Sequence, residues 1–456
     1  MKDADQHPHH VRDTFGSSFG VLVALAGSAV GLGNLWRFPY LVGENGGAAF
    51  ILIYLAFVCL LGIPVMLSEF IIGRRSQANA CGAFRKLAPG TPWHISGILA
   101  VICCILILSF YSVVGGWGVA YLIRAVRFDF TSTPSEELSS FFTNFTASTW
   151  KPLICHTVFI AASALIVVFG VKNGIEKFSK IMMPVLFVIM IGLAVRSLTL
   201  PGAGAGITYL FKPDWSAVTA DTVLAALGQA FFSLSLGSGM VITYGSYVSK
   251  KANILSLSGQ TALADTLFAI ISGCAIMPAV FAFGISPGEG PGLVFITLPH
   301  IFGNLPLGGV IAIFFFVALL LAALTSSISL FEVIAAFCIE EFKIKRRVAV
   351  AMTFSVLWIL GCLCSLSLGV LGDWKLFGKN IFDLFDYVSA NVLMLLGGLV
   401  VVVFVGWKMG RKTIHDELSN NRERHIPEWF IALVTFLIRY LAPVAILAIM
   451  IFQWVS

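Results

Sequence analysis

The chain has 456 residues, of which 58% are hydrophobic and 11% are charged. Soluble globular proteins carry about 25% charged residues, so this composition excludes a protein solvated mainly by water. The formal net charge of +6 does not indicate nucleic acid as a partner, because the basic residues stand in short clusters between apolar runs. The expected partner is the lipid bilayer.

Apolar runs long enough to cross a bilayer recur along the whole chain. A spanning helix needs about 20 mostly apolar residues, whereas the strands of a membrane barrel have about ten residues that alternate in polarity. These runs are too long and too uniformly apolar for barrel strands, so we predict an all-α integral membrane protein. We count eleven spans, near 18–40, 46–72, 94–126, 153–170, 174–198, 222–247, 258–284, 305–339, 347–371, 382–408 and 428–454.

Lysine and arginine predict the orientation of these spans. Cytoplasmic loops are enriched in both residues, and most of the 29 fall on one side if the N-terminus is cytoplasmic. We therefore expect a multi-pass protein of the plasma membrane, or of the bacterial inner membrane. Its N-terminus is expected in the cytoplasm and its C-terminus on the extracellular or periplasmic side.

Two spans carry runs of small and polar residues that favour a break in the helix. The first span contains GSAVGLGN at 27–34, and the sixth contains SLSLGSG at 233–239. Close helix packing is the alternative, because Gly27 and Gly31 form a G-x-x-x-G pair. Interruptions at matching positions of two halves, however, are typical of a transporter's central site. We divide the chain into a cytoplasmic tail (1–14), a first five-helix repeat (15–200), a second repeat (201–410), and a loop with the eleventh helix (411–456).

Broken helices expose backbone groups that bind ions. Helix N-termini suit a carboxylate, and freed carbonyl oxygens suit sodium. Among the candidates to complete such a site, Asp265 is the charged one, and a structural hydrogen bond is the alternative role for its carboxylate. The other candidates to complete such a site are Asn34, Ser233, Thr325, Ser326 and Ser327.

The ordered motifs of the chain resemble those of the neurotransmitter:sodium symporter family. GSAVGLGNLWRFP at 27–39 and ENGG at 44–47 resemble the signature of its first span. The resemblance continues through Gly62-Ile-Pro64, Glu69, FFSLSLG at 231–237 and LTSS at 324–327, and covers nearly the whole chain. It implies a leucine-transporter-like fold, a 5+5 inverted repeat with broken helices 1 and 6. The expected activity is sodium-coupled transport by alternating access, and the span count and short loops resemble bacterial amino-acid carriers.

The resemblance implies two sodium ions as the ligands that drive transport. The first site would include the substrate carboxylate itself, so that ion and substrate complete each other's sites. Its protein ligands would be Ala29, Asn34, Ser233 and Asp265. Those of the second site would be Gly27, Val30, Ala322, Thr325 and Ser326.

The same resemblance places a substrate pocket between the broken helices. Monoamine carriers of the family place Asp at the position of Gly31, so Gly31 predicts an α-amino acid that brings its own carboxylate. Tyr111 would bind that carboxylate, Phe232 would cover the site, and Ser238 leaves room for a large hydrophobic or aromatic side chain. The substrate-binding candidates are Ser28, Gly31, Gly33, Ile107, Tyr111, Phe232, Ser235, Ser238, Ser327 and Leu330.

Gate residues are implied on both sides of this pocket. Arg37 and Asp386 match the outer gate, and Arg12 with Glu340 matches the inner one, with Glu341 as the alternative partner. Nine residues separate Gly174 from Pro184, as in a fifth-span motif of the family that unwinds on the cytoplasmic side. A simple kink at Pro184 is the alternative.

Two departures from the family pattern concern chloride. Asp265 stands where an asparagine is usual, and Ala269 where chloride-dependent members carry serine, although Tyr54 and Gln229 remain. A fixed carboxylate can replace the anion, so we expect chloride-independent transport. A second hypothesis is that Asp265 takes up a proton after sodium leaves, which would give proton counter-transport.

Other classes of function fit the sequence less well. Residues 16–20 match G-x-S-x-G but open a spanning helix, without the strand–turn–helix context of a nucleophile elbow, so we do not expect an enzyme. An ion channel would favour rings of like charge from several subunits. A proton-coupled amino-acid transporter and an amino-acid sensor on the same fold remain as alternatives. The eleventh span serves either packing within the chain or a homodimer, and both remain open.

Overall fold

The computed structural model describes residues 14–131, 133–286 and 292–455, and these are almost entirely helical. The α-helices are α1 (Ser18–Ala29), α2 (Phe38–Glu44), α3 (Ala48–Phe57), α4 (Ile63–Ser76), α5 (Ala80–Leu87), α6 (His94–Val126), α7 (Ser135–Ala147), α8 (Trp150–Val168), α9 (Lys177–Leu198), α10 (Gly204–Phe211), α11 (Ala220–Ser233), α12 (Met240–Gly245), α13 (Ile254–Ala282), α14 (Leu298–Gly303), α15 (Gly308–Phe342), α16 (Arg346–Leu366), α17 (Ile381–Tyr387), α18 (Met394–Val403), α19 (Gly410–Leu418), α20 (Glu428–Phe436) and α21 (Ala442–Val455).

Wider π-helical turns join several of these helices into longer rods. They are η1 (Gly33–Arg37), η2 (Val58–Gly62), η3 (Val171–Glu176), η5 (Leu293–Thr297), η6 (Val388–Leu393), η7 (Phe404–Met409) and η8 (Leu437–Leu441). A short 3₁₀ turn, η4 (Trp215–Ala217), precedes α11. Such π-turns leave local irregularity in a helix and are frequent near functional sites.

The predicted number of eleven spans is not confirmed. Among the described residues, nine helices are long and apolar enough to cross a membrane, and the bent pair in the first span raises the number to ten. The segment predicted as the sixth span consists of α11 and α12, with 14 and 6 residues, so neither part has the length of a span. The break that favoured a binding site therefore also removes this segment from a count based on helix length.

The first span breaks between Ala29 and Gly33. Val30 adopts an extended backbone conformation with φ −70° and ψ 103°, which ends α1. The segment Gly33–Glu44 then continues at an angle of 49° to α1. The interruption predicted from the glycine-rich run is therefore present, and it leaves the backbone oxygens at 27–30 without the continuous ladder of an intact helix.

The sixth span breaks between Ser233 and Met240. Three residues in this loop have positive φ, namely Ser235 at +54°, Gly237 at +78° and Gly239 at +77°. At Gly237 a Cβ atom would lie only 1.9 Å from the backbone oxygen of Met394 in α18. Glycine is therefore required there both by the backbone angle and by the close approach of α18.

Glu69 of α4 holds this loop in place. Its side chain is fully buried, and Oε1 accepts a hydrogen bond of 2.6 Å from the backbone N–H of Gly237. An N–H in an interrupted membrane helix has no water to bind, so a carboxylate is a strong replacement partner. The acid that the motif comparison singled out thus has a structural role in the break.

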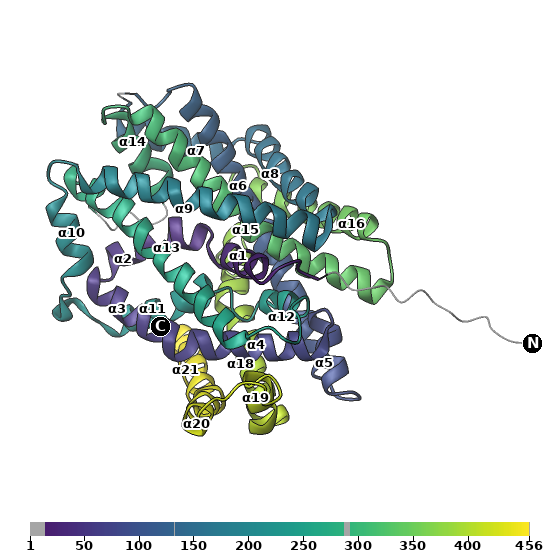
Figure 1. Cartoon of the computed structure of the whole chain (residues 1–456). Coiled ribbons are helices and arrows are strands. Elements are labelled where there is room, and N and C mark those ends of the chain that lie inside the picture. The colour runs from purple at the N-terminus through teal and green to yellow at the C-terminus, as the bar shows by residue number, and fades with distance from the viewer. Residues whose placement is uncertain (1–13, 132, 287–291, 456) are drawn as a thin grey trace, which may run out of the picture.

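The broken helices lie inside the helical bundle. α1 packs against α9, α13 and α15, and it lies near the middle of the view in Figure 1. α6 packs along α15 and also contacts α8 and α16. The yellow helices α20 and α21 lie at the lower edge of the same view, where α21 contacts α18 and α20 contacts α19. The surrounding helices therefore separate the breaks from lipid.

We predict that Glu69→Ala weakens the protein through the loop at 234–239. Loss of a hydrogen bond to a charged group costs about 1.5–3 kcal/mol, so the midpoint of thermal unfolding in detergent should fall by several degrees. Glu428→Ala is the control, because its ion pair with Arg411 is exposed and such pairs contribute about 0–1 kcal/mol. Equal midpoints for the two variants would contradict the role of Glu69.

Candidate functional site

The first candidate ion site is a buried cluster of polar side chains around Asp265. The amide of Asn34 in η1 donates to Asp265 Oδ1 at 2.8 Å and to Ser233 Oγ at 3.1 Å. The hydroxyls of Ser233 and Tyr54 donate to Asp265 Oδ2 at 2.7 and 3.2 Å. All four side chains are almost completely buried. Residues from α3, η1, α11 and α13 therefore meet at one carboxylate beside both breaks.

The second predicted set of sodium ligands also comes together, at the contact between α1 and α15. Thr325 Oγ1 lies 3.4 Å from the backbone oxygen of Val30 and 2.9 Å from that of Ala322. Ser326 Oγ lies 3.3 Å from the oxygen of Val30 and 3.5 Å from that of Gly27. Carbonyl and hydroxyl oxygens are hard donors, and their convergence suits a small hard cation such as sodium.

A small cavity of about 40 Å³ lies between the broken helices. Its walls include Tyr111, whose hydroxyl accepts a hydrogen bond of 3.2 Å from the backbone N–H of Leu32. The predicted pocket residues among its lining are Gly31, Gly33, Ile107, Tyr111, Phe232, Ser235, Ser238 and Leu330. The break in each span thus contributes backbone and side chains to one central cavity.

Two predicted pocket residues have other partners and are not among those that line the cavity. Ser28 donates to the backbone oxygen of Leu25 at 2.7 Å. Ser327 shares a hydrogen bond of 2.6 Å with Ser163 of α8, on a different face of α15. The family motif gives the positions of these serines, but the rotation of each helix determines where their hydroxyls point.

Three apolar residues line the cavity although the sequence analysis did not select them. They are Leu32, Met240 and Met394. Leu32 lies inside the first break and Met240 follows the second. Their position next to glycines is the only feature of the local sequence that could have indicated a place in the cavity wall. Met394 comes from α18, and an apolar residue in an apolar span carries no signal of its own.

Gly31 is closely surrounded. A Cβ atom at this position would lie 2.4 Å from Ser326 Oγ and 3.1 Å from the hydroxyl oxygen of Tyr111. A side chain at residue 31 would therefore displace a hydroxyl from either the second oxygen cluster or the central cavity. This geometry gives a physical reason for glycine in addition to the one that the sequence comparison offers.

A larger cavity of about 330 Å³ adjoins the central one and shares Leu32, Gly33, Tyr111 and Phe232 with it. Arg37 and Asp386, the predicted outer gate, both line this cavity. The ion pairs of the described residues do not include one between them, and the guanidinium carbon of Arg37 lies 4.6 Å from the centre of the Phe232 ring. The two gate residues thus face one vestibule without closing it.

The predicted inner gate is described only in part. Arg12 lies outside the described residues. Glu340 near the end of α15 accepts hydrogen bonds from the backbone N–H and the side-chain amide of Asn79, at 2.8 and 3.0 Å. The alternative partner, Glu341, forms an ion pair of 2.8 Å with Arg85. Glu340 is therefore anchored to the start of α5.

The fifth span is helical around the predicted unwinding motif. Gly174 lies in η3, where a Cβ atom would be 2.2 Å from the backbone oxygen of Ile166, and Pro184 lies within α9. A contact that the sequence analysis missed lies next to it. Glu176 accepts hydrogen bonds from Gly16 N–H at 2.6 Å and Ser17 Oγ at 3.1 Å. The start of α1 is thus tied to the fifth span.

Interrupted spans, two oxygen clusters and a central cavity beside a vestibule define a multi-pass membrane transporter of the leucine-transporter-like fold. A crystal structure of MhsT in complex with L-phenylalanine matches with a TM-score of 0.89 and 46% sequence identity, over 96% of this chain and 99% of that one. The predicted fold class, all-helical with broken helices 1 and 6, is therefore confirmed apart from the number of spans.

The model of the sodium:neurotransmitter symporter family matches residues 12–136 and 128–456. The sodium-dependent transporter YhdH of Bacillus subtilis is 41% identical over 95% of this chain and 96% of its own length. The sodium- and chloride-dependent taurine transporter of Homo sapiens is 28% identical over 90% of this chain and 73% of its own. The chain belongs to the sodium:neurotransmitter symporter family.

We predict that Asn34→Ala raises the sodium concentration needed to stabilise the protein. The variant removes the shortest hydrogen bond to Asp265 Oδ1. Loss of a bond to a charged group costs about 1.5–3 kcal/mol, which corresponds to a change in affinity of about tenfold or more. The measurement is the midpoint of thermal unfolding as sodium chloride replaces potassium chloride.

Asn304→Ala is the control for this measurement. Asn304 is exposed, and its side-chain amide donates locally to the backbone oxygen of His300. We expect its sodium dependence to equal that of the wild type. A shift of the same size in both asparagine variants would remove Asn34 from the ion site.

Proposed function

We propose that this protein is a sodium-coupled symporter of an α-amino acid that works by alternating access. The observation that supports this proposal is that two oxygen clusters lie beside the breaks of the first and sixth spans, whose residues line one small cavity. Oxygen donors of this kind suit sodium, and helix breaks at mid-membrane are the usual site of substrate binding in such transporters.

The proposed substrate is a large hydrophobic or aromatic amino acid, for which the central cavity of about 40 Å³ would widen into the adjoining cavity of about 330 Å³. Tyr111 offers a hydroxyl inside the cavity for a substrate carboxylate, and Gly31 leaves no carboxylate of the protein at that place. Apolar walls from Ile107, Leu330 and two methionines suit an apolar side chain, and methionine adapts its shape readily. L-phenylalanine, the amino acid in the MhsT structure, is the first compound to test.

Two sodium ions are proposed to couple to this substrate through one short segment. The carbonyl of Ala29 and the amide of Asn34 would serve the first ion, together with the substrate carboxylate. The carbonyls of Gly27 and Val30 would serve the second ion from the same segment. An ion that orders residues 27–34 favours substrate binding, and the substrate favours ion binding by the same factor.

Alternating access is proposed to use the gates on both sides of the cavity. Arg37 and Asp386 would approach each other when the vestibule closes. On the other side, Arg12 and Glu340 would separate as the region between Gly174 and Pro184 unwinds. In the proposed orientation the vestibule faces outside, the N-terminus is cytoplasmic, and the two five-helix repeats (15–200 and 201–410) move relative to each other in the plasma membrane.

Transport is proposed to be independent of chloride. The hydroxyls of Tyr54 and Ser233 both donate to the Asp265 carboxylate, so the donors that would bind an anion already have a negatively charged partner. Ala269, one turn further along α13, provides no hydroxyl. A fixed carboxylate therefore supplies the charge that chloride supplies elsewhere.

Two alternatives use the same site differently. In the first, protons replace sodium as the coupling ion or travel in the opposite direction, since a buried carboxylate that loses its cation is costly unless it is neutralised. In the second, the protein is a sensor that binds an amino acid without moving it. Uptake into proteoliposomes at varied internal pH separates both alternatives from the proposed symporter, because a sensor gives no uptake and proton coupling makes uptake depend on internal pH. We propose no enzymatic activity.

We predict sodium-dependent binding of one or a few amino acids from a panel of twenty radiolabelled compounds. Purified protein is measured in sodium and in potassium, with phenylalanine and large aliphatic amino acids expected to bind in sodium. Equal binding in the two salts would remove sodium coupling. No binding in either salt would contradict the amino-acid substrate inferred from Gly31.

We predict that uptake survives replacement of chloride by gluconate, and that the carboxylate is the reason. Asp265→Asn removes the fixed charge, so uptake should fall by about tenfold or more, as for other lost charged partners. The double variant Asp265→Asn/Ala269→Ser should regain uptake only when chloride is present.

Asp265→Asn/Ala264→Ser is the matched control, because Ala264 lies on the same helix and its hydroxyl would stand before rather than one turn after residue 265. Chloride should not rescue this variant. Complete loss of wild-type uptake in sodium gluconate would contradict the proposal of chloride independence.

A further inference from the structure

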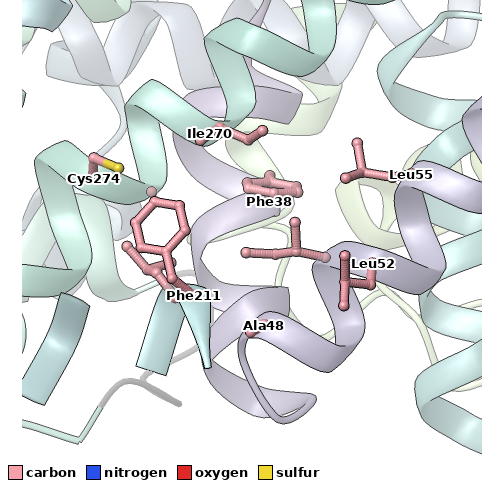
Figure 2. A pocket seen from close by; sticks show the side chains of 10 residues that line it. Phe38, Ala48, Leu52, Leu55, Phe211, Ile270 and Cys274 are labelled. Atoms are coloured by element: carbon pink, nitrogen blue, oxygen red, sulfur yellow. The ribbon is translucent and has the colours of Figure 1, made fainter. Parts of the chain in front are cut away.

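A second cavity, separate from the central one, lies between α2, α3, α10 and α13. Its volume is about 160 Å³, and the residues that line it are all apolar or small. Figure 2 shows Phe38 at its back, Leu52 and Leu55 on one side, and Phe211 and Cys274 on the other. No residue proposed for sodium or substrate belongs to its lining.

The mouth of this cavity faces the bilayer. Leu52 on α3 and Phe211 on α10 are 44% and 59% exposed, and α3 and α13 belong to spanning helices. Leu263 and Leu267 continue this exposed apolar surface along α13. The surroundings of the mouth are therefore the hydrocarbon of the membrane.

Size and chemistry restrict what the cavity can hold. A buried water needs two to four polar partners, which this lining does not provide. An apolar cavity of about 150 Å³ stays free of water and binds benzene. The matching occupant in a membrane is a segment of hydrocarbon chain, which removes apolar surface from an unfilled space and gains dispersion contacts.

Gly273 keeps the cavity open although the packing does not demand glycine there. A Cβ atom at residue 273 would lie 3.4 Å from Leu210 Cδ2 and 3.9 Å from Phe38 Cε1, which are ordinary contact distances. This differs from Gly237, where a Cβ atom would meet backbone at 1.9 Å. The space beside Gly273 is therefore available to an occupant.

The back wall of the cavity contacts the first ion cluster through one side chain. The ring of Phe38, fully buried, lies 5.3 Å from the ring of Tyr54, centre to centre. The hydroxyl of Tyr54 donates to Asp265 Oδ2 at 3.2 Å. An occupant of the cavity that contacts Phe38 therefore affects the position of Tyr54 and, through it, the hydrogen bond to Asp265.

We propose that this cavity binds the acyl chain of a membrane lipid, and that the bound chain raises sodium affinity by supporting Phe38 and Tyr54. The second part rests on the proposed role of Asp265 as a sodium ligand. The first part does not, so the two are measured separately.

The occupant is tested with a phosphatidylcholine that carries a photoreactive diazirine in its acyl chain, in liposomes that hold the full chain. Peptide mass spectrometry then maps the label. We expect it to concentrate on the cavity-lining residues of α3 and α13, and to be lost there in Gly273→Leu and in Cys274→Phe, which fill the space. Ala56→Leu, exposed on α3 outside the cavity, should keep the label. Even labelling of all lipid-facing helices, unchanged by the filled variants, overturns the site.

The coupling is tested by comparing lipids with straight chains and lipids with methyl-branched phytanoyl chains, which are wider and are expected to enter the cavity less well. In the wild type we expect the half-saturating sodium concentration for thermal stabilisation to rise about fivefold in the branched lipid, at the low end of typical coupling between sites. In Gly273→Leu the side chain replaces the lipid, so both lipids should give one value. Equal values in the wild type overturn the coupling. Absence of any sodium effect overturns the ion site instead, while the labelling result still decides whether lipid binds.

Discussion

In a lipid bilayer no water is available for backbone N–H and C=O groups, so the two interrupted spans depend on partners from the protein. The N–H of Gly237 binds the carboxylate of Glu69, and the N–H of Gly31 binds the side-chain oxygen of Asn34. The oxygens at 27–30 face hydroxyls of α15. Each partner comes from a different helix or from the break itself. The arrangement of the bundle around the breaks is therefore fixed by the need to satisfy these groups, and the central cavity lies where they meet.

The segment 27–34 connects both oxygen clusters to the cavity. Its carbonyls face Thr325 and Ser326, while Asn34 at its end contacts Asp265. The loop at 234–239 lies across the cavity and is held against α18 through Gly237. A change in the backbone of one short segment thus alters both clusters and the cavity wall together. This geometry would link the proposed ion binding to the proposed substrate binding without any long chain of contacts.

The sequence was sufficient for features that depend on composition or on motif. Glycine-rich runs inside apolar spans predicted both breaks, because glycine lowers helix stability and its φ is unrestricted. The motif comparison selected the residues of both oxygen clusters, which the fold then brings together. The side chain of Met394 could not be selected, since an apolar residue in an apolar span has no distinguishing pattern. The sequence could not show that the hydroxyls of Ser28 and Ser327 have other partners, because their direction depends on helix rotation, which spacing along the chain does not give.

Contacts between segments far apart in the chain could not be predicted from the sequence either. Nothing near Glu176 indicates that it binds the backbone of Gly16, 160 residues earlier in the chain. The number of spans is not confirmed for a related reason. A count from hydropathy treats the sixth segment as continuous, whereas Ser235, Gly237 and Gly239 give it a loop with three positive φ angles. The glycines indicate where such a loop begins, but its shape is decided by its contacts with α18 and α4.

The buried acids of the described residues differ in what balances their charge. There are four of them: Glu69, Glu176, Asp265 and Glu332. Glu176 and Glu332 each pair with a basic side chain. Glu69 binds the backbone of an interrupted span. The hydrogen-bond partners of the Asp265 side chain are an amide and two hydroxyls, all neutral. A buried carboxylate without a cation is costly. Asp265 shares this property with Glu69, but Asp265 also contacts Asn34 and Ser233, the side chains of the proposed first sodium site.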